Sequence, residues 1–276
     1  MPWRAHEKNS DSERDGCDGG IIVLEHGRGI NHLPWLLPLL LAPFIGSFLG
    51  VLIRRLPQHR PVGLTRSECE SCGHALGLPD MVPIASYLAL GGRCRFCRAP
   101  IARFHVAIEL GALGVAGWAA SAESDPLRLW IGCTLGWALL ALAWIDAECM
   151  LLPDALTLPL ILLGLAATWL QCPERVADHA LGAVVGYLAF RGIAYLYRVM
   201  RRRDGLGQAD AKLLAAAGAW VGWAALPLLV LMAALAGLGA ALLAALSGRR
   251  LHAGTRLPFG PFLAAALWLT WLYGAV

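Results

Sequence analysis

Two aspartates stand where apolar stretches of the chain meet polar ones. Asp146 comes at the end of the apolar run 128–147, and Asp210 comes immediately before the apolar run 211–246. An acid at a membrane helix centre costs about 2.5–3.5 kcal/mol on insertion scales, so it usually has a task and a partner. Two acids at one depth could share a proton and hydrolyse a peptide bond as general base and general acid. Such acids also line ion pathways or cap helices, so the residues alone leave proteolysis, transport and structural roles open.

Four cysteines form two CxxC pairs in one polar loop. Cys69 and Cys72 are followed, after 21 residues, by Cys94 and Cys97. This spacing predicts a tetrahedral structural zinc site, in which the metal holds the shape of the loop and has no open position for chemistry. The alternative is a set of unligated or redox-active thiols. The other four cysteines are scattered, which favours a metal site over a disulfide framework.

The composition is typical of a polytopic membrane protein. Hydrophobic residues make up 58% of the 276 residues and charged residues only 15%, compared with about 25% in soluble domains. Apolar runs of roughly 20 residues predict an all-α bundle of about eight spans. The run 211–246 is too long for one span, so we expect two helices that turn near Pro227. The predicted spans cover 33–53, 104–122, 128–147, 151–171, 179–199, 211–246 as two helices, and 257–275.

The distribution of arginine and lysine predicts the orientation of the spans. The loop 54–103 has eight arginines against three acids, and the loops 198–212 and 247–256 are also basic. With eight spans these loops fall on one side, which the positive-inside rule makes the cytoplasm. The same count places Asp146 and Asp210 at similar depth near the cytoplasmic face.

Three further polar residues are candidates for supporting roles. Asp154 follows Pro153 and could cap the fourth span or hold a partner helix. Glu109 lies inside the second span, where an interhelical pair, for instance with Arg191, is the simplest interpretation. Lys212 comes two residues after Asp210.

Several motifs together resemble one known family, the bacterial type IV prepilin peptidases. The similarity begins at GSFLGVLIRRLP, Gly46 to Pro57, and continues through the tetracysteine loop and Glu109. It includes Asp146 followed, after six intervening residues, by the pair Pro153 and Asp154, and the glycine-rich stretch before Asp210 and Lys212. Two positions depart from the family pattern: Ala209 replaces a glycine, and Gly50 replaces an asparagine of the first motif.

The resemblance implies a function and roles for the residues. Asp146 and Asp210 would be the catalytic pair, with Asp154, Lys212 and Glu109 in support and Glu109 also a candidate contact for the leader. The substrate would be a type IV prepilin or type II secretion pseudopilin, cut on the cytoplasmic side of the bacterial inner membrane. The new N-terminal amine would be methylated from S-adenosylmethionine. Zinc and membrane lipid are the other expected partners, and no nucleic acid is expected.

The chain is accordingly predicted to have three parts. Residues 1–32 form a polar extension that we expect to be disordered. Residues 33–122 comprise the first span, the zinc-binding cytoplasmic loop 54–103 and the second span, a region associated with methyl transfer. Residues 123–276 form the membrane region that carries the peptidase site, with its core at 128–246. The rival functions are a proton- or cation-coupled transporter that uses the same aspartates, and a non-catalytic assembly protein.

Overall fold

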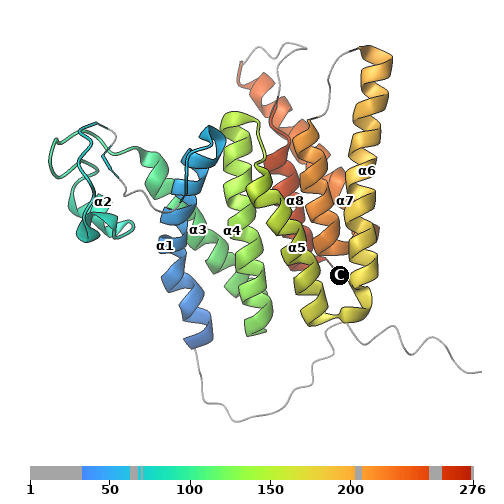
Figure 1. Ribbon diagram of the computed structural model, residues 1–276, viewed down its shortest axis with the longest axis horizontal. Helices are drawn as coiled ribbons and strands as arrows, with labels where there is room; N and C mark the ends of the chain where they lie inside the picture. The colour runs from blue at the N-terminus through green and yellow to red at the C-terminus, as the bar shows by residue number, and fades with distance from the viewer. Residues whose placement is uncertain (1–32, 63–67, 70, 203–206, 249–256, 275–276) are drawn as a thin grey trace, which may run out of the picture.

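The computed structural model describes residues 33–62, 68–69, 71–202, 207–248 and 257–274, so the predicted extension 1–32 lies outside it. A bundle of helices forms the body of the protein, and a small lobe lies beside α1 and α3 (Figure 1). The main helices are α1 (Leu33–Arg55), α3 (Arg103–Ala122), α4 (Pro126–Cys149), α5 (Asp154–Gln171), α6 (Val176–Arg201), α7 (Gln208–Leu246) and α8 (Gly260–Tyr273). The lobe contains the short helix α2 (Ala85–Ala89) and the 3₁₀ turns η1 (Leu56–Gln58) and η2 (Leu78–Met81), and η3 (Pro173–Arg175) precedes α6.

The predicted all-α, polytopic architecture is confirmed. Six of the described helices, α1 and α3 to α7, are long and apolar enough to cross a membrane. The prediction was about eight spans, and the difference arises from α7 and α8. α7 has 39 residues and is interrupted by a break that divides it into two helical arms. α8 has only 14 residues. If the two arms of α7 are counted separately and α8 is added, the described chain has eight apolar helical segments.

The break in α7 lies at Gly222, and not at Pro227 as predicted. Gly222 has φ 75° and ψ 171°, a conformation open to glycine and strained for other residues, whereas Pro227 lies inside the second helical arm. Proline excludes the hydrogen bond to the carbonyl four residues earlier, here Trp223, the first residue after the break. The sequence signal at Pro227 therefore marks the start of the second arm, and the chain turns where a glycine permits it.

A buried histidine on α6 stabilises this break. The carbonyl of Ala219 would normally accept a hydrogen bond from the amide four residues later, which the break at Gly222 removes. His179 Nδ1 lies 3.1 Å from the Ala219 carbonyl oxygen and donates to it. Thr168 Oγ1 lies 3.0 Å from the same ring nitrogen. A polar side chain thus replaces the lost backbone donor inside the bundle, where an unsatisfied carbonyl would be costly.

Small residues allow α6 and the first arm of α7 to pack closely. A Cβ atom on Gly218 would lie 2.1 Å from the Gly182 carbonyl oxygen, and one on Gly186 would lie 2.6 Å from the Leu214 carbonyl oxygen. Gly182 and Gly186 are four residues apart and therefore lie on one face of α6. Such a spacing of small residues is typical of tightly packed membrane helices, whose backbones make van der Waals contact.

The ends of the helices that carry the two aspartates lie at the same end of the bundle. α4 ends and α7 begins at this end, where α5 also begins and α6 ends (Figure 1). Met150, with φ 53°, closes the last turn of α4 by donating its amide hydrogen to the Asp146 carbonyl. α5 begins at Asp154 and not at the predicted 151, because Pro153 adopts an extended conformation before it.

Candidate active site and metal centre

Asp146 lies in the last turn of α4 and is almost completely buried, with 4% of its surface exposed. Its neighbour in the sequence, Ile145, is also buried, so this face of α4 points into the bundle. A carboxylate in such a place needs hydrogen-bond donors. The donor comes from α8: the backbone amide of Gly260 donates to Asp146 Oδ2 over 2.9 Å in a buried contact.

Gly260 can approach Asp146 only because it has no side chain. A Cβ atom at this position would lie 2.6 Å from Asp146 Oδ2 and 2.8 Å from its Cγ, well inside van der Waals contact. Gly260 is also the first residue of α8, so its amide is one of the free donors at a helix start. Gly260 is not among the residues predicted from the sequence, where its only signal is a glycine before Pro261 at the start of the last apolar run.

Asp210 lies in the first turn of α7 and has 9% of its surface exposed. Its side chain turns back and accepts a hydrogen bond from the amide of Gly207, the residue that precedes the helix. Ala209, where the family pattern has glycine, is helical and packs against the core. Alanine is the best helix former, so the backbone geometry at this position places no demand for glycine.

The structure brings Asp146 and Asp210 together, although they come from different helices 64 positions apart in the chain. The two carboxyl groups are close enough for their charges to interact. Both are buried, and each accepts one hydrogen bond from a glycine amide, Gly260 and Gly207 respectively. A pair of neighbouring buried acids, each held by a backbone donor, is suited to sharing one proton.

Asp154 and Lys212 form an ion pair next to this site. Lys212 Nζ contacts Asp154 Oδ1, which joins the first turn of α5 to the first turn of α7. Asp154 is the first residue of α5, and no side-chain bond caps that helix. Of the two roles expected for Asp154, the structure shows the contact with a partner helix. The side chain of Asp154 is 57% exposed, so this pair lies at the rim of the bundle.

The four loop cysteines converge on one point. The sulfur atoms of Cys69, Cys72, Cys94 and Cys97 all lie within 4.8 Å of one another, and the Cys69 and Cys97 sulfurs are 3.8 Å apart. Zinc–sulfur bonds of about 2.3 Å in a tetrahedron place sulfurs about 3.8 Å apart, so the cluster fits zinc. Of the other described cysteines, Cys133 and Cys149 are free and Cys172 is disulfide-bonded.

The two CxxC turns have the same backbone construction. The backbone carbonyl of Cys69 accepts a hydrogen bond from the amide of Gly73, and the backbone carbonyl of Cys94 accepts one from the amide of Arg98. Gly73 and Arg98 both have left-handed conformations, with φ 68° and 60°. Each follows the second cysteine of its pair, so the two turns present their sulfurs in the same way. This repeated geometry supports a single metal centre formed by both turns.

The thiols of Cys69 and Cys72 differ in how readily they ionise. Backbone hydrogen bonds from Ser71 and Cys72 lower the pKa of the Cys69 thiol to about 6. A backbone hydrogen bond from His74 lowers the pKa of Cys72, but desolvation and the neighbouring thiols of Cys69 and Cys97 outweigh it and raise the pKa to about 11. One thiol therefore ionises readily while its neighbour resists, as expected where several sulfurs compete and a metal would supply the missing positive charge.

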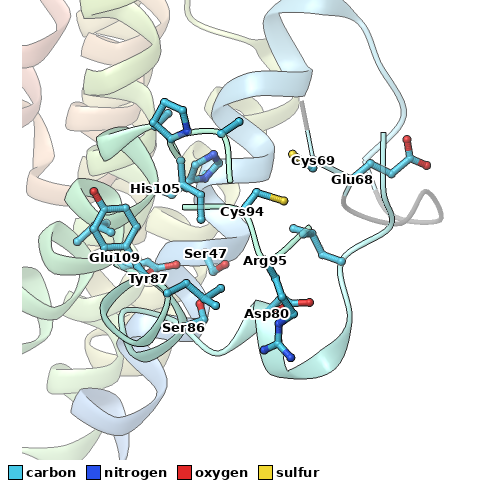
Figure 2. Close-up of a pocket in the computed structure, with 18 of the residues that line it drawn as sticks. Ser47, Glu68, Cys69, Asp80, Ser86, Tyr87, Cys94, Arg95, His105 and Glu109 are labelled. Carbon is cyan, nitrogen blue, oxygen red and sulfur yellow. Dashed lines mark ion pairs between the residues drawn. The ribbon is translucent and has the colours of Figure 1, made fainter. Parts of the chain in front are cut away.

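A cavity of about 310 Å³ lies between the tetracysteine lobe and the helices α1 and α3. Figure 2 shows Ser47 and Glu109 on the helix side and Cys94, Asp80 and Arg95 on the lobe side. Arg95 Nε and Asp80 Oδ1 form an ion pair of 2.9 Å. The lining therefore combines acidic, basic and aromatic groups, and it includes two of the four clustered cysteines, Cys69 and Cys94.

Glu109 is buried at the wall of this cavity, with 6% of its surface exposed. Its Oε2 atom accepts the amide hydrogen of Ile84 over 2.7 Å, and its side chain also accepts from Ser47. These partners replace the expected pairing with Arg191, which is exposed on α6. Gly46 brings the two helices together here, because a Cβ on it would lie 2.6 Å from the Glu109 Cα.

These features define a class: a multi-pass helical membrane protein with paired acids at one end of its bundle and a tetracysteine lobe. The chain matches the sequence model described as the bacterial peptidase A24 N-terminal domain over residues 40–122. It matches that of the type IV leader peptidase family over residues 133–242. No solved structure matches it.

Several curated proteins are similar over most of their length. One from Pseudomonas aeruginosa is 36% identical over 86% of this chain and 89% of its own. One from Aeromonas hydrophila is 36% identical over 92% of this chain and 95% of its own. One from Burkholderia pseudomallei is 42% identical over 79% of this chain and 71% of its own. All three are named prepilin leader peptidase/N-methyltransferase. The chain belongs to the type IV leader peptidase family.

Proposed function

We propose that this protein is an aspartic endopeptidase of the bacterial inner membrane that removes the leader of a prepilin or pseudopilin on the cytoplasmic side. It then methylates the new N-terminal amine with S-adenosylmethionine as the donor. The observation that carries the peptidase proposal is the meeting of two buried acids, Asp146 and Asp210, at one end of a bundle in a member of this family. The three relatives described above are all named as peptidases. Their names do not favour the alternative that this protein is a proton- or cation-coupled transporter.

Peptide hydrolysis follows from the placement of the two carboxyl groups. One of them, ionised, takes a proton from a water molecule as that water attacks the scissile carbonyl. The other, protonated, donates to the carbonyl oxygen and then to the leaving amine. The amides of Gly260 and Gly207 hold the two side chains in place, so little reorganisation is needed during the reaction.

The apolar part of the substrate would approach from the bilayer. An apolar groove lies between the second arm of α7 and the start of α8, and its lining includes Gly237, Phe259 and Phe262. Phe259 directly precedes Gly260, whose amide binds Asp146. A substrate helix in this groove would bring the end of its apolar segment to the acids, while the basic leader would stay in the cytoplasm.

The proposed zinc ion would have a structural role. All four positions of a tetrahedral ion would be filled by the thiols of Cys69, Cys72, Cys94 and Cys97, which leaves no site for water or substrate. A metal there would hold together the lobe that closes one side of the cavity. Because the resemblance associates residues 33–122 with methyl transfer, the methyl-transfer activity would depend on the metal more than the peptidase activity does.

Substitution of each acid by asparagine tests the peptidase proposal. Asp146→Asn and Asp210→Asn keep the size of the side chain and remove the ionisable group. We expect each to slow prepilin cleavage at least about a thousandfold, because general acid–base catalysis contributes about 10²–10⁴. Asp178→Asn is the matched control and should cleave within a few-fold of wild type, since Asp178 is an exposed aspartate in the first turn of α6, at the other end of the bundle. Normal cleavage by both catalytic-site variants would refute the assignment.

A further inference from the structure

We infer that the connector between α4 and α5, Met150 to Pro153, binds the leader residues next to the scissile bond through hydrogen bonds between the two backbones. The inference rests on the proposed function, because it assigns a binding element to the same cleavage reaction. The connector lies at the end of the bundle where α4 ends and α7 begins (Figure 1). Its four residues lie between the two helices and belong to neither.

The backbone of the connector has polar groups without partners in the described part of the chain. The Met150 amide closes the last turn of α4, and the Pro153 carbonyl accepts from the first turn of α5. Among the described residues, no hydrogen bond involves the amide or the carbonyl of Leu151 or Leu152. Leu152 has only 6% of its surface exposed and belongs to the hydrophobic core. More than about 90% of buried backbone groups in native proteins are paired, so these groups indicate a ligand that supplies the partners.

The connector has a fixed, extended shape. Pro153 has φ −64° and ψ 133°, which is an extended conformation. A residue before proline is restricted to extended conformations, and this restriction applies to Leu152. Met150, with φ 53°, turns the chain out of α4 and into this segment. Because the shape is set before the substrate arrives, little conformational entropy is lost on binding.

The connector joins the two helix ends that carry the catalytic acids. At its start, the Met150 amide donates to the Asp146 carbonyl over 2.9 Å. Directly after its end, Asp154 contacts Lys212 in the first turn of α7, the turn that also carries Asp210. A peptide that reaches the acids therefore passes the connector on its way to the cytoplasm.

Peptide hydrolysis at this place requires such a binding element. In a helix the backbone groups of the scissile bond are hydrogen-bonded within the helix, and the carbonyl carbon is shielded from water. Unwinding the start of the apolar segment frees these groups at the edge of the membrane, where unpaired backbone groups are costly. Pairing with an extended segment of the enzyme restores their hydrogen bonds, as in other cases of strand addition.

The apolar groove and the connector lie on either side of the acids. Phe259 lines the groove, and the next residue, Gly260, donates to Asp146. Contacts thus run from the groove through Asp146 to the connector. The groove binds the part of the substrate that stays helical, and the connector binds the part that is extended. Met150 and Leu151 are 46% and 51% exposed, so their apolar side chains can contact those of the leader.

Single amide-to-ester replacements in the substrate test the backbone contact. Prepilin peptides carry one ester each, at successive positions on the leader side of the scissile bond. An ester removes one N–H donor and keeps every side chain. Because successive backbone groups of an extended segment point to opposite sides, we expect kcat/KM to fall about tenfold at a position that pairs with the connector. It should stay within threefold at the positions on either side of it. An equal effect at every position, or none at any, would overturn the inference.

A photoreactive side chain at the connector tests the location. Leu151→benzoylphenylalanine is compared with Leu170→benzoylphenylalanine, because Leu170 is 66% exposed in the last turn of α5, at the other end of that helix. The full chain carries Asp146→Asn in one series and Asp210→Asn in the other, so that bound prepilin stays uncut. In both series we expect cross-links from position 151 to the residues next to the scissile bond, at least tenfold above those from position 170. Equal cross-linking from the two positions, or none from position 151, would overturn the location.

The cleavage assay with unmodified prepilin separates failure of the inference from failure of the proposed function. If wild type cuts prepilin but the ester series shows no single sensitive position and position 151 gives no cross-link, the peptidase function stands and the connector does not bind the leader. If wild type does not cut prepilin, the peptidase proposal itself is wrong, and this inference fails with it.

Discussion

The two polar regions of this protein are built in different ways. Asp146 and Asp210 are held by packing: they are buried at helix ends, and glycine amides approach them directly. The lobe has almost no hydrophobic core, since only Pro83, Gly92 and Cys94 are buried among its described residues from 56 to 102. A segment that buries so little cannot be held by the hydrophobic effect, and four converging thiols supply the alternative.

The difference shows how a membrane protein can support two reactions with one chain. The acids need a fixed geometry and limited access to water, which a packed bundle provides. A cavity for a soluble, charged molecule needs polar walls, which a polar loop provides more readily than apolar helices do. The two regions should therefore respond differently to substitution and to metal removal.

Gly260→Ala should have the largest effect on the packed region. The added Cβ would overlap Asp146 Oδ2, so the carboxylate must move. A displacement of about 1 Å can cost about a hundredfold in rate, and we expect prepilin cleavage to fall by that amount. Gly239→Ala is the control, because nothing lies within 4 Å of a Cβ there. If both variants cleave equally and have the same thermal stability, Gly260 does not position Asp146.

Cys94→Ser should affect the tetracysteine lobe selectively. Loss of one of four thiolates would weaken the zinc site, so zinc content measured by mass spectrometry should fall. We expect donor binding and methylation to fall at least about tenfold, with cleavage within threefold of wild type. Cys133→Ser, at a buried cysteine of α4 away from the cluster, controls for thiol loss. An equal loss of both activities in Cys94→Ser would mean that the two regions are not independent.

His179→Ala should have a smaller effect, on stability alone. It removes the donor to the Ala219 carbonyl and leaves a buried acceptor unsatisfied. The expected loss is about 1–3 kcal/mol in the free energy of unfolding, seen as a lower melting temperature in detergent. Leu181→Ala on the exposed face of the same helix is the control. Equal melting temperatures would show that the histidine does not stabilise the break in α7.

Much of this arrangement follows from the sequence, for identifiable reasons. The spans are visible because a membrane requires runs of about 20 apolar residues. The cysteine cluster is visible because CxxC turns constrain four ligands locally, and the structure confirms that Cys69, Cys72, Cys94 and Cys97 converge. The meeting of Asp146 and Asp210 could be anticipated because the number of spans between them places both at one face.

The rest depends on contacts between distant segments, which no local pattern encodes. The hydrogen bond from Gly260 to Asp146 joins residues 114 positions apart. Glu109 pairs with Ile84 and Ser47 in place of Arg191 because the lobe folds back onto α1 and α3. Pro227 was the stronger local signal for a break in α7, but the chain turns at Gly222. The turn there is accompanied by a tertiary contact, the hydrogen bond from His179 to the Ala219 carbonyl.

The most direct test of the account is the activity of Asp146→Asn on two substrates. One is an intact prepilin, and the other is a pilin peptide with the mature N-terminus already free. We expect this variant to fail to cut the prepilin but to methylate the peptide at the wild-type rate, because Asp146 belongs to the packed bundle and not to the tetracysteine lobe. Normal cutting of the prepilin, or loss of methylation together with cutting, would contradict it.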